Sequence, residues 1–220
     1  IIDQDQELDN YIAFYLPMHV AKLFELFDNI EALKDLNDTV NIYDWGCGQG
    51  IATMSLLEYA KINHLSLNIE KIVLIEPSAL AIQKGKRYVE RTDVFKDQNC
   101  QLSLINKDIN SLSGNDLFEE ENYEIHLFSN ILDVDEVDIQ HVQKLVDHHS
   151  SKKTIIIASP NYFDARKKID QFVDYFDSSK NIIYEQHQND LKVFCKDFRS
   201  KKNRNRRCTS YSVCYTTQHG

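Results

Sequence analysis

The stretch YDWGCGQGIAT, residues 43–53, contains three of the six glycines in a chain of 220 residues. Glycine reaches positive φ angles at no steric cost and lets a ligand approach the main chain. The run VNIYDW is short, β-branched and aromatic, which predicts a buried strand, and GIATMSLLEYAKINHL predicts a helix. Gly46, Gly48 and Gly50 therefore lie in a turn at the carboxyl end of a strand, where open α/β sheets bind ligands.

Strand and helix patterns alternate through most of the chain. Apolar runs in EKIVLIE, CQLSLIN, NYEIHLFSN and KKTIIIAS predict further buried strands, with amphipathic runs between them that predict helices. This alternation is typical of a parallel sheet covered on both faces. The last two expected strands, DLKVFCKDF and CTSYSVCYTT, are joined only by the basic run RSKKNRNRR, too short for a crossover helix. We therefore expect an antiparallel hairpin at the end of the sheet.

The alternation divides the chain into a lead-in and one globular unit. Residues 1–38 form a helical lead-in, since apolar residues recur at helical spacing in ELDNYIAFYLPMHVAKLFELFDNI. Pro17 is expected to kink or split that helix. Residues 39–220 are expected to form a single domain, because a chain that is 42% hydrophobic can bury one substantial core at this length.

Composition excludes several classes of protein. No run approaches the roughly 18 apolar residues that a membrane helix needs, and the acidic start lacks the pattern of a secretory signal. The five cysteines are scattered without a CxxC pair, which argues against a disulfide framework and favours a reducing compartment. We expect a cytoplasmic protein without a membrane partner or a metal; the alternative is a metal site built from Cys208, Cys214 and a distant histidine.

The glycine spacing separates this loop from common phosphate-binding loops. GxGxG differs from the GxGxxG of nicotinamide and flavin sites, and no Lys-Ser/Thr pair follows as in a P-loop. Asp44 directly precedes the glycines, where its carboxylate would repel a phosphate and attract a cation. An α-amino group beside a sulfonium is such a cation.

Polar residues also follow the next three expected strands. Glu76 ends the second strand, where a carboxylate can accept both ribose hydroxyls of an adenosine; the alternative is a solvated acid. Asp108 follows the third strand and can accept the adenine amino group, while Ile109 packs on the ring. Asn130 ends the fourth strand and could hold the methyl acceptor or the methionine end of a cofactor; the alternative is a loop that only caps the next helix.

Taken together, residues 40–218 resemble class I S-adenosylmethionine-dependent methyltransferases. The resemblance implies an α/β, Rossmann-like fold with a mostly parallel seven-stranded sheet of order 3-2-1-4-5-7-6, helices on both faces and an antiparallel last strand. It implies S-adenosylmethionine as the cofactor. The cofactor-binding residues would be Asp44, Gly46, Cys47, Gly48, Gly50, Glu76, Pro77, Asp108, Ile109, Ser129 and Asn130. The runs YIAFYLPMHVAKLFELF and EPSALAIQKGKRYV are also similar to methyltransferase-like proteins associated with the small ribosomal subunit, although their cysteine-rich metal-binding region is not evident here.

Residues that could act on the methyl acceptor are few. Methyl transfer is an in-line displacement in which an enzyme aligns donor and acceptor and can remove a proton. Asn130 and Asp133 are the catalytic candidates; the alternative for Asp133 is an acid that the dipole of the next helix favours. Tyr11 and Tyr15 could close over the cofactor and bind substrate, or pack in the core. His126, within the fourth strand, is expected to be a core or interface histidine.

The charge of the chain is uneven. The net charge is −9, yet residues 199–207 hold six basic residues and no acidic one. Arg204, Arg206 and Arg207 could bind phosphates of an RNA acceptor; the alternative is a solvated hairpin tip. The acceptor is thus left open between RNA and a small molecule. The alternative function is a non-catalytic assembly or regulatory factor with the same fold that binds RNA or protein, whereas glycine spacing and the terminal hairpin disfavour a nicotinamide-dependent oxidoreductase.

Overall fold

The computed structural model describes residues 2–117, 122–176, 180–196 and 202–217. The helices are α1 (Asp5–Asp28), α2 (Glu31–Lys34), α3 (Ile51–Ile62), α4 (Ala79–Val89), α5 (Asp93–Asp97), α6 (Ile139–Val146) and α7 (Phe163–Asp174), with 3-10 turns η1 (Ile109–Ser111) and η2 (Gly114–Asp116). The strands are β1 (Thr39–Trp45), β2 (Asn68–Ile75), β3 (Gln101–Ile105), β4 (Tyr123–Ser129), β5 (Lys153–Ser159), β6 (Lys180–Lys196) and β7 (Asn203–Thr217). Among these helices, none combines the length and the apolarity needed to cross a membrane.

The seven strands form one sheet of order β3-β2-β1-β4-β5-β7-β6. Strands β1 to β5 pair in parallel, whereas β7 pairs antiparallel with both β5 and β6. The predicted sheet order and the antiparallel last strand are therefore confirmed. Because the central strands are parallel, the carboxyl ends of β1, β2 and β4 meet at one edge of the sheet.

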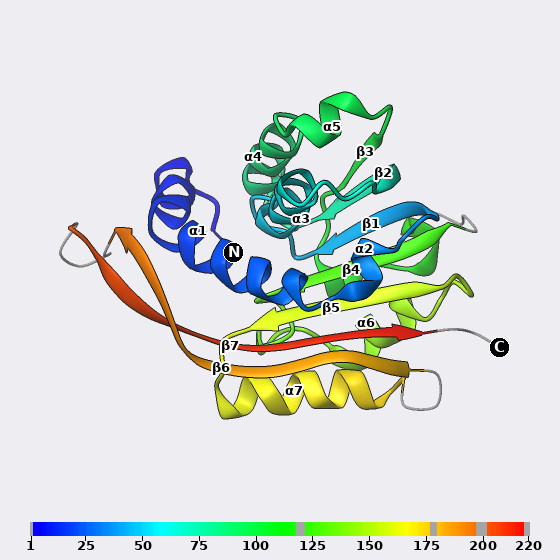
Figure 1. Ribbon diagram of the computed structural model, residues 1–220. Helices are drawn as coiled ribbons and strands as arrows, with labels where there is room; N and C mark the ends of the chain where they lie inside the picture. The colour runs from blue at the N-terminus through cyan, green and yellow to red at the C-terminus, as the bar shows by residue number, and fades with distance from the viewer. Residues whose placement is uncertain (1, 118–121, 177–179, 197–201, 218–220) are drawn as a thin grey trace.

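Alternate residues of the strands build two cores, one on each face of the sheet (Figure 1). On one face, Ile42 and Ile72 pack with residues of α1, α2, α3 and α4, among them Phe27 and Leu56. On the other face, aromatic and branched residues of the strands pack against α6 and α7, with Trp45 and Phe172 fully buried. The central strands are covered on both sides, which is why they read as continuous apolar runs.

Pro17 does not split the leading helix. Helix α1 is continuous from Asp5 to Asp28 with Pro17 inside it. Figure 1 shows the axis of α1 changing direction along its length, as a proline that removes one backbone hydrogen bond would produce.

The terminal hairpin is longer than the sequence patterns predicted. β7 pairs with β5 only through residues 211–217, while residues 203–210 pair with β6 alone. Residues 188–196 and 203–210 thus form a two-stranded arm beyond the sheet, seen in Figure 1 as the orange and red strands that reach toward α1. The prediction that the basic run is only a connection was wrong, because residues 203–207 belong to β7; residues 199–201 lie outside the described part of the chain.

Candidate functional site

The glycine loop connects β1 to α3, and all three glycines have positive φ. The φ angles are 62° at Gly46, 52° at Gly48 and 70° at Gly50, a region that L side chains rarely adopt. A Cβ at Gly46 would lie 2.5 Å from Cγ1 of Ile131, so the loop is also tightly packed there. At Gly48, by contrast, a Cβ would meet no protein atom within 4 Å. The main chain at Gly48 is therefore open to a ligand.

A cavity of about 200 Å³ lies between this loop, the carboxyl ends of β2 and β4, and α1. Several residues predicted for the site line it, namely Tyr11, Asp44, Gly46, Cys47, Gly48, Glu76, Ser129 and Asn130. The other lining residues are Ile2, Leu8, His19, Gln49, Ile51, Ala52 and Ala81. Residues far apart in the chain thus converge at the edge of the sheet where a ligand was expected.

Two carboxylates line the cavity, and each is held by hydrogen bonds. Asp44 is 1% exposed, and its Oδ2 accepts from the Thr53 amide at 3.1 Å and from Thr53 Oγ1 at 2.7 Å. Burial raises the pKa of Asp44 to about 7. Glu76 accepts from the Gly48 amide at 3.0 Å and the Ser78 amide at 3.0 Å; burial raises its pKa, and these two hydrogen bonds oppose the rise. Both acids are fixed in place before any ligand arrives.

Gln49 presents an unsatisfied acceptor at the cavity. Its Nε2 donates to the Leu8 carbonyl at 2.9 Å, which fixes the orientation of the amide because a carbonyl can only accept. The Oε1 atom of Gln49 is buried without a hydrogen-bond partner. A buried acceptor without a partner is unusual in a folded protein, which singles out Gln49 among the residues that line the cavity.

The first turns of α1 are fixed across the cavity by polar contacts to α4 and its N-cap. Lys84 forms ion pairs with Asp5, at 2.9 Å, and with Asp9. The Ser78 hydroxyl donates to Asp3 at 2.9 Å. Since Leu8 and Tyr11 line the cavity from the same helix, α1 is one of its walls and keeps bulk water from that side.

A row of polar groups, here termed the cavity cluster, runs from α1 to the end of β4: Tyr11, His19, Lys22 and Asn130. The Lys22 ammonium donates to Asn130 Oδ1 at 3.0 Å. Asn130 Nδ2 faces His19 Nδ1 at 2.7 Å, and His19 Nε2 lies 3.0 Å from Tyr11 Oη. Asn130 has a φ of 56°, so a left-handed backbone directs its side chain toward α1.

The hydrogen-bond donors and acceptors of the cavity cluster can be assigned one after another, starting from Lys22. An ammonium can only donate, so the oxygen of Asn130 faces Lys22 and the amide nitrogen of Asn130 donates to His19 Nδ1. His19 therefore carries its proton on Nε2 and donates to Tyr11 Oη. This neutral form agrees with the pKa of His19, which burial and the nearby Lys22 charge lower to about 3. The hydroxyl proton of Tyr11 is left to donate elsewhere.

Other predicted residues lie outside the lining of this cavity, within the part of the chain that the structure describes. Tyr15 packs beside Met18 against the arm. Asp108 caps η1 by accepting from the Asn110 amide at 2.8 Å, and Ile109 is 5% exposed in the core. Asp133 accepts from Ser159 Oγ at 3.0 Å. Pro77 and Gly50 also lie outside the lining, and the roles of all these residues stay predictions.

Three residues of the site, His19, Lys22 and Gln49, were not predicted from the sequence. Tyr11, Tyr15, His19 and Lys22 recur at spacings of four, four and three residues, so they share one face of a helix. A polar row on the mostly apolar middle of α1, residues 11–24, was the signal that could have found His19 and Lys22. Nothing in the local sequence distinguishes Gln49, because its role depends on the distant Leu8 carbonyl.

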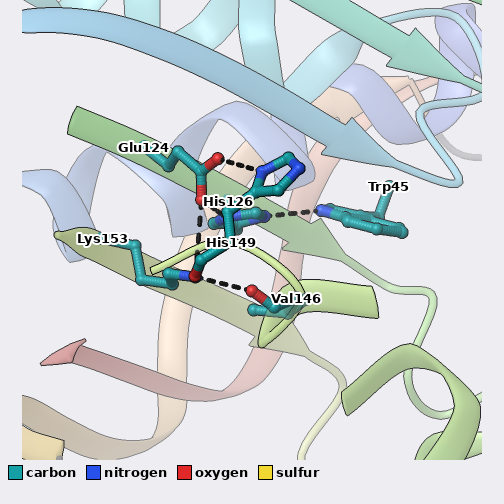
Figure 2. A network of polar contacts seen from close by, with 6 residues as sticks. All are labelled: Trp45, Glu124, His126, Val146, His149 and Lys153. Atoms are coloured by element: carbon teal, nitrogen blue, oxygen red, sulfur yellow. Dashed lines mark hydrogen bonds and ion pairs between the residues drawn. The ribbon is translucent and has the colours of Figure 1, made fainter. Parts of the chain in front are cut away.

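A second buried polar network, here termed the inner cluster, lies within the fold (Figure 2): Trp45, Glu124, His126, His149 and Lys153. Trp45 Nε1 donates to His126 Nδ1 at 3.0 Å, and His126 Nε2 contacts Glu124 at 3.1 Å. Glu124 also contacts His149 Nδ1 at 2.7 Å and Lys153 Nζ at 3.5 Å. The prediction that His126 is a core histidine is confirmed, since it is 2% exposed.

Comparisons with known proteins address the fold. No family model matches the chain, and no curated protein matches its sequence. Among solved structures, the plantazolicin methyltransferase BpumL, in complex with an analogue and SAH, is 14% identical with a TM-score of 0.58, over 97% of this chain and 90% of that one. Precorrin-6y C5,15-methyltransferase from Geobacter metallireducens is 11% identical with a TM-score of 0.54, over 86% of each chain.

A candidate RNA methyltransferase from Pyrococcus horikoshii is 9% identical with a TM-score of 0.52, over 91% of this chain and 83% of that one. The three proteins share a reaction type and differ in what their names say they methylate. At these identities the likeness establishes the fold. The chain has the Rossmann-like fold of class I S-adenosylmethionine-dependent methyltransferases.

Proposed function

We propose that this protein is an S-adenosylmethionine-dependent methyltransferase. The observation that carries the proposal is the meeting of Asp44, Gly48 and Glu76 at one cavity, at the carboxyl edge of a sheet with the methyltransferase fold. These residues combine an open main chain with two fixed carboxylates. Such a wall suits a ligand that carries hydroxyls and a positive charge, and it does not suit a phosphate.

The residues at the cavity fit S-adenosylmethionine in their chemistry. Glu76 would hold the ribose hydroxyls, and Asp44 with the unpartnered Gln49 oxygen would face the methionine ammonium. From outside the lining, Pro77, Asp108 and Ile109 are proposed to hold the adenine, while Cys47, Ser129, Gly46 and Gly48 would contact the methionine part. When bound, the cofactor supplies a methyl group on a sulfonium, which is electrophilic.

The chain's own contribution is to exclude water and orient the acceptor. Helix α1 closes one side of the cavity, and the hydroxyl proton of Tyr11 can donate to an acceptor oxygen or nitrogen. Hydrogen bonds with Lys22 and His19 hold the Asn130 side chain in place, so this residue would act by fixing the cavity wall at the end of β4. Asp133 is the proposed base for acceptors that must lose a proton.

Calorimetric titration with S-adenosylmethionine and S-adenosylhomocysteine tests the cofactor assignment. Glu76→Gln should weaken binding by about 10- to 150-fold, because a hydrogen bond to a charged group contributes roughly 1.5–3 kcal/mol. Glu90→Gln is the matched control, since Glu90 is an exposed acid on the far end of α4 and should bind the cofactor as the parent does. Absence of binding in the parent, or equal loss in both variants, would reject the assignment.

A methyl-transfer screen against RNA, protein and small-molecule pools tests the enzymatic activity. Transfer of a labelled methyl group to any pool, lost in Glu76→Gln, would support an enzyme. Cofactor binding without transfer to any pool would instead favour the alternative, a non-catalytic factor that keeps the fold and the cofactor.

A further inference from the structure

The arm formed by β6 and β7 has two different faces. Its inner face packs on α1, where Cys195 and Cys208 are 4% and 7% exposed beside Met18. Leu191 and Val193 add to the same contact. Figure 1 shows the arm lying next to α1 beyond the end of the sheet. The arm is therefore held by an apolar contact, and its opposite face is turned away from α1.

Strand alternation decides which residues occupy the outer face. Residues 191, 193 and 195 contact α1, so Lys192 and Phe194 lie on the other side of β6. In β7, Arg207 is opposite Lys192 and Asn205 is opposite Phe194. Lys192 and Arg207 are exposed, and Phe194 is 67% exposed. The outer face thus presents an aromatic ring next to a pair of cations.

Two of the three arginines singled out in the sequence lie on opposite sides of the arm. Arg206 is opposite Val193 and shares the inner side of the arm, whereas Arg207 lies on the outer side. The side chain of Arg204 is outside the described part of the structure. On the outer face, Arg207 is accompanied by Phe194 and Lys192, which were not predicted from the sequence as site residues.

Charge is concentrated at the arm. Residues 191–208 contain eight Lys and Arg residues and one Asp. The remaining residues then hold 17 basic and 33 acidic side chains, a net charge of −16. The rest of the protein would repel a polyanion and the arm would attract it, so a polyanion should approach the protein at the arm. The alternative is that Lys192 only prevents this edge strand from aggregating. An exposed phenylalanine beside it would promote aggregation, which disfavours that alternative.

We propose that the outer face of the arm binds single-stranded RNA. Phe194 stacks on one base, and the neighbouring pair Lys192 and Arg207 neutralises phosphates of the same strand. Aromatic side chains on a strand with flanking cations recognise unpaired bases in this way, because every base has a face to stack. This binding does not depend on the proposed methyl transfer, so either can fail alone.

Fluorescence anisotropy with the whole chain and a labelled, mixed-sequence RNA of twelve nucleotides tests the proposal. Phe194→Ala should weaken binding by about 5- to 150-fold, since stacking of one base contributes roughly 1–3 kcal/mol. Phe194→Trp should restore it. Phe163→Ala is the matched control, because Phe163 is a 73% exposed ring that also lies near cations, Arg166 and Lys167, but on α7 and outside the arm, so its loss should leave RNA binding unchanged.

Salt dependence tests the two cations. Lys192→Ala and Arg207→Ala should each reduce the slope of log affinity against log salt by about 0.7, the value for one phosphate contact on a single strand. Heparin, a polyanion without bases, should bind Phe194→Ala as well as it binds the parent. The proposal is overturned if the parent binds no RNA at low salt, if Phe194→Ala matches Phe163→Ala, if the slopes do not change, or if heparin binding falls as much as RNA binding.

Discussion

The inner cluster and the cavity cluster each bury a lysine and a neutral histidine, but they compensate the buried charge differently. In the inner cluster, Lys153 is 0% exposed, donates to the Val146 and His149 carbonyls at 2.7 Å each, and lies 3.5 Å from the carboxylate of Glu124. In the cavity cluster, Lys22 is 6% exposed and donates to Asn130. Within the described residues, no carboxylate oxygen lies within the 4.0 Å ion-pair distance of its ammonium.

We expect this difference to separate a structural network from one that serves a ligand site. Removing a charge from water is costly, and a partner charge with good hydrogen bonds offsets that cost. Glu124 satisfies this condition: contacts with His126, His149 and Lys153 hold the pKa of its carboxyl well below its usual range. Lys22 does not, and burial lowers the pKa of its ammonium. Incomplete compensation beside a cavity is what a ligand site requires, because the ligand can complete it.

The same substitution in both clusters tests this distinction most directly. Lys153→Met should destabilise the fold by about 3–5 kcal/mol, because it leaves the Glu124 carboxylate buried without its cationic partner. Lys22→Met should change stability by less than about 1 kcal/mol, because it removes a buried charge that has no carboxylate partner. Urea unfolding monitored by circular dichroism measures both values. Equal destabilisation by the two variants would contradict the distinction.

A second test uses pH and the histidine of the cavity cluster. Burial lowers the pKa of His19 to about 3 from 6.5, so the unfolded chain binds more protons between these values. Stability must then fall as the pH drops below 6.5, by up to about 1.4 kcal/mol per pH unit for one histidine. His19→Gln should flatten the loss of stability between pH 6 and pH 4.5 by roughly 1 kcal/mol per unit.

The inner cluster also contributes to the loss of stability in this pH range, and its contribution must be separated from that of His19. Burial also lowers the pKa of His126, so this histidine adds its own loss of stability below 6.5. Glu124 acts at lower pH, because its depressed pKa stabilises the fold above the unfolded value of 4.5 and that contribution is lost as the pH falls toward the folded pKa. Equal profiles for the parent and His19→Gln would show that His19 is not buried in its neutral form.

The sequence predicted the sheet order and much of the cavity, and it failed where contacts are long-range. Asp44, the glycines and Glu76 could be predicted because each lies at or just after the end of a strand, and parallel strands bring their carboxyl ends together. Lys22 and Asn130 are 108 residues apart, and local patterning does not predict their contact. The terminal hairpin was predicted, but residues 180–189 of β6 and 203–207 of β7 were not predicted as strand, because these stretches are mostly polar and lack the apolar run that marked the central strands. The length of β6 became visible only through pairing with β7.

The smallest expected effect comes from two left-handed residues, one in the cavity cluster and one outside both clusters. His64 and Asn130 have φ angles of 55° and 56°, which glycine adopts without strain. His64 is exposed just after α3, so His64→Gly should stabilise the fold by up to about 1 kcal/mol.

Asn130→Gly gains less from the backbone, since asparagine tolerates this region, and it removes the acceptor of Lys22 and the donor to His19. It should therefore destabilise the fold by about 1–2 kcal/mol despite the relaxed backbone. Thermal unfolding of the two variants side by side measures the opposite signs. If Asn130→Gly stabilised the fold as His64→Gly does, the side chain of Asn130 would contribute nothing to the cavity cluster, and its left-handed backbone would need another explanation.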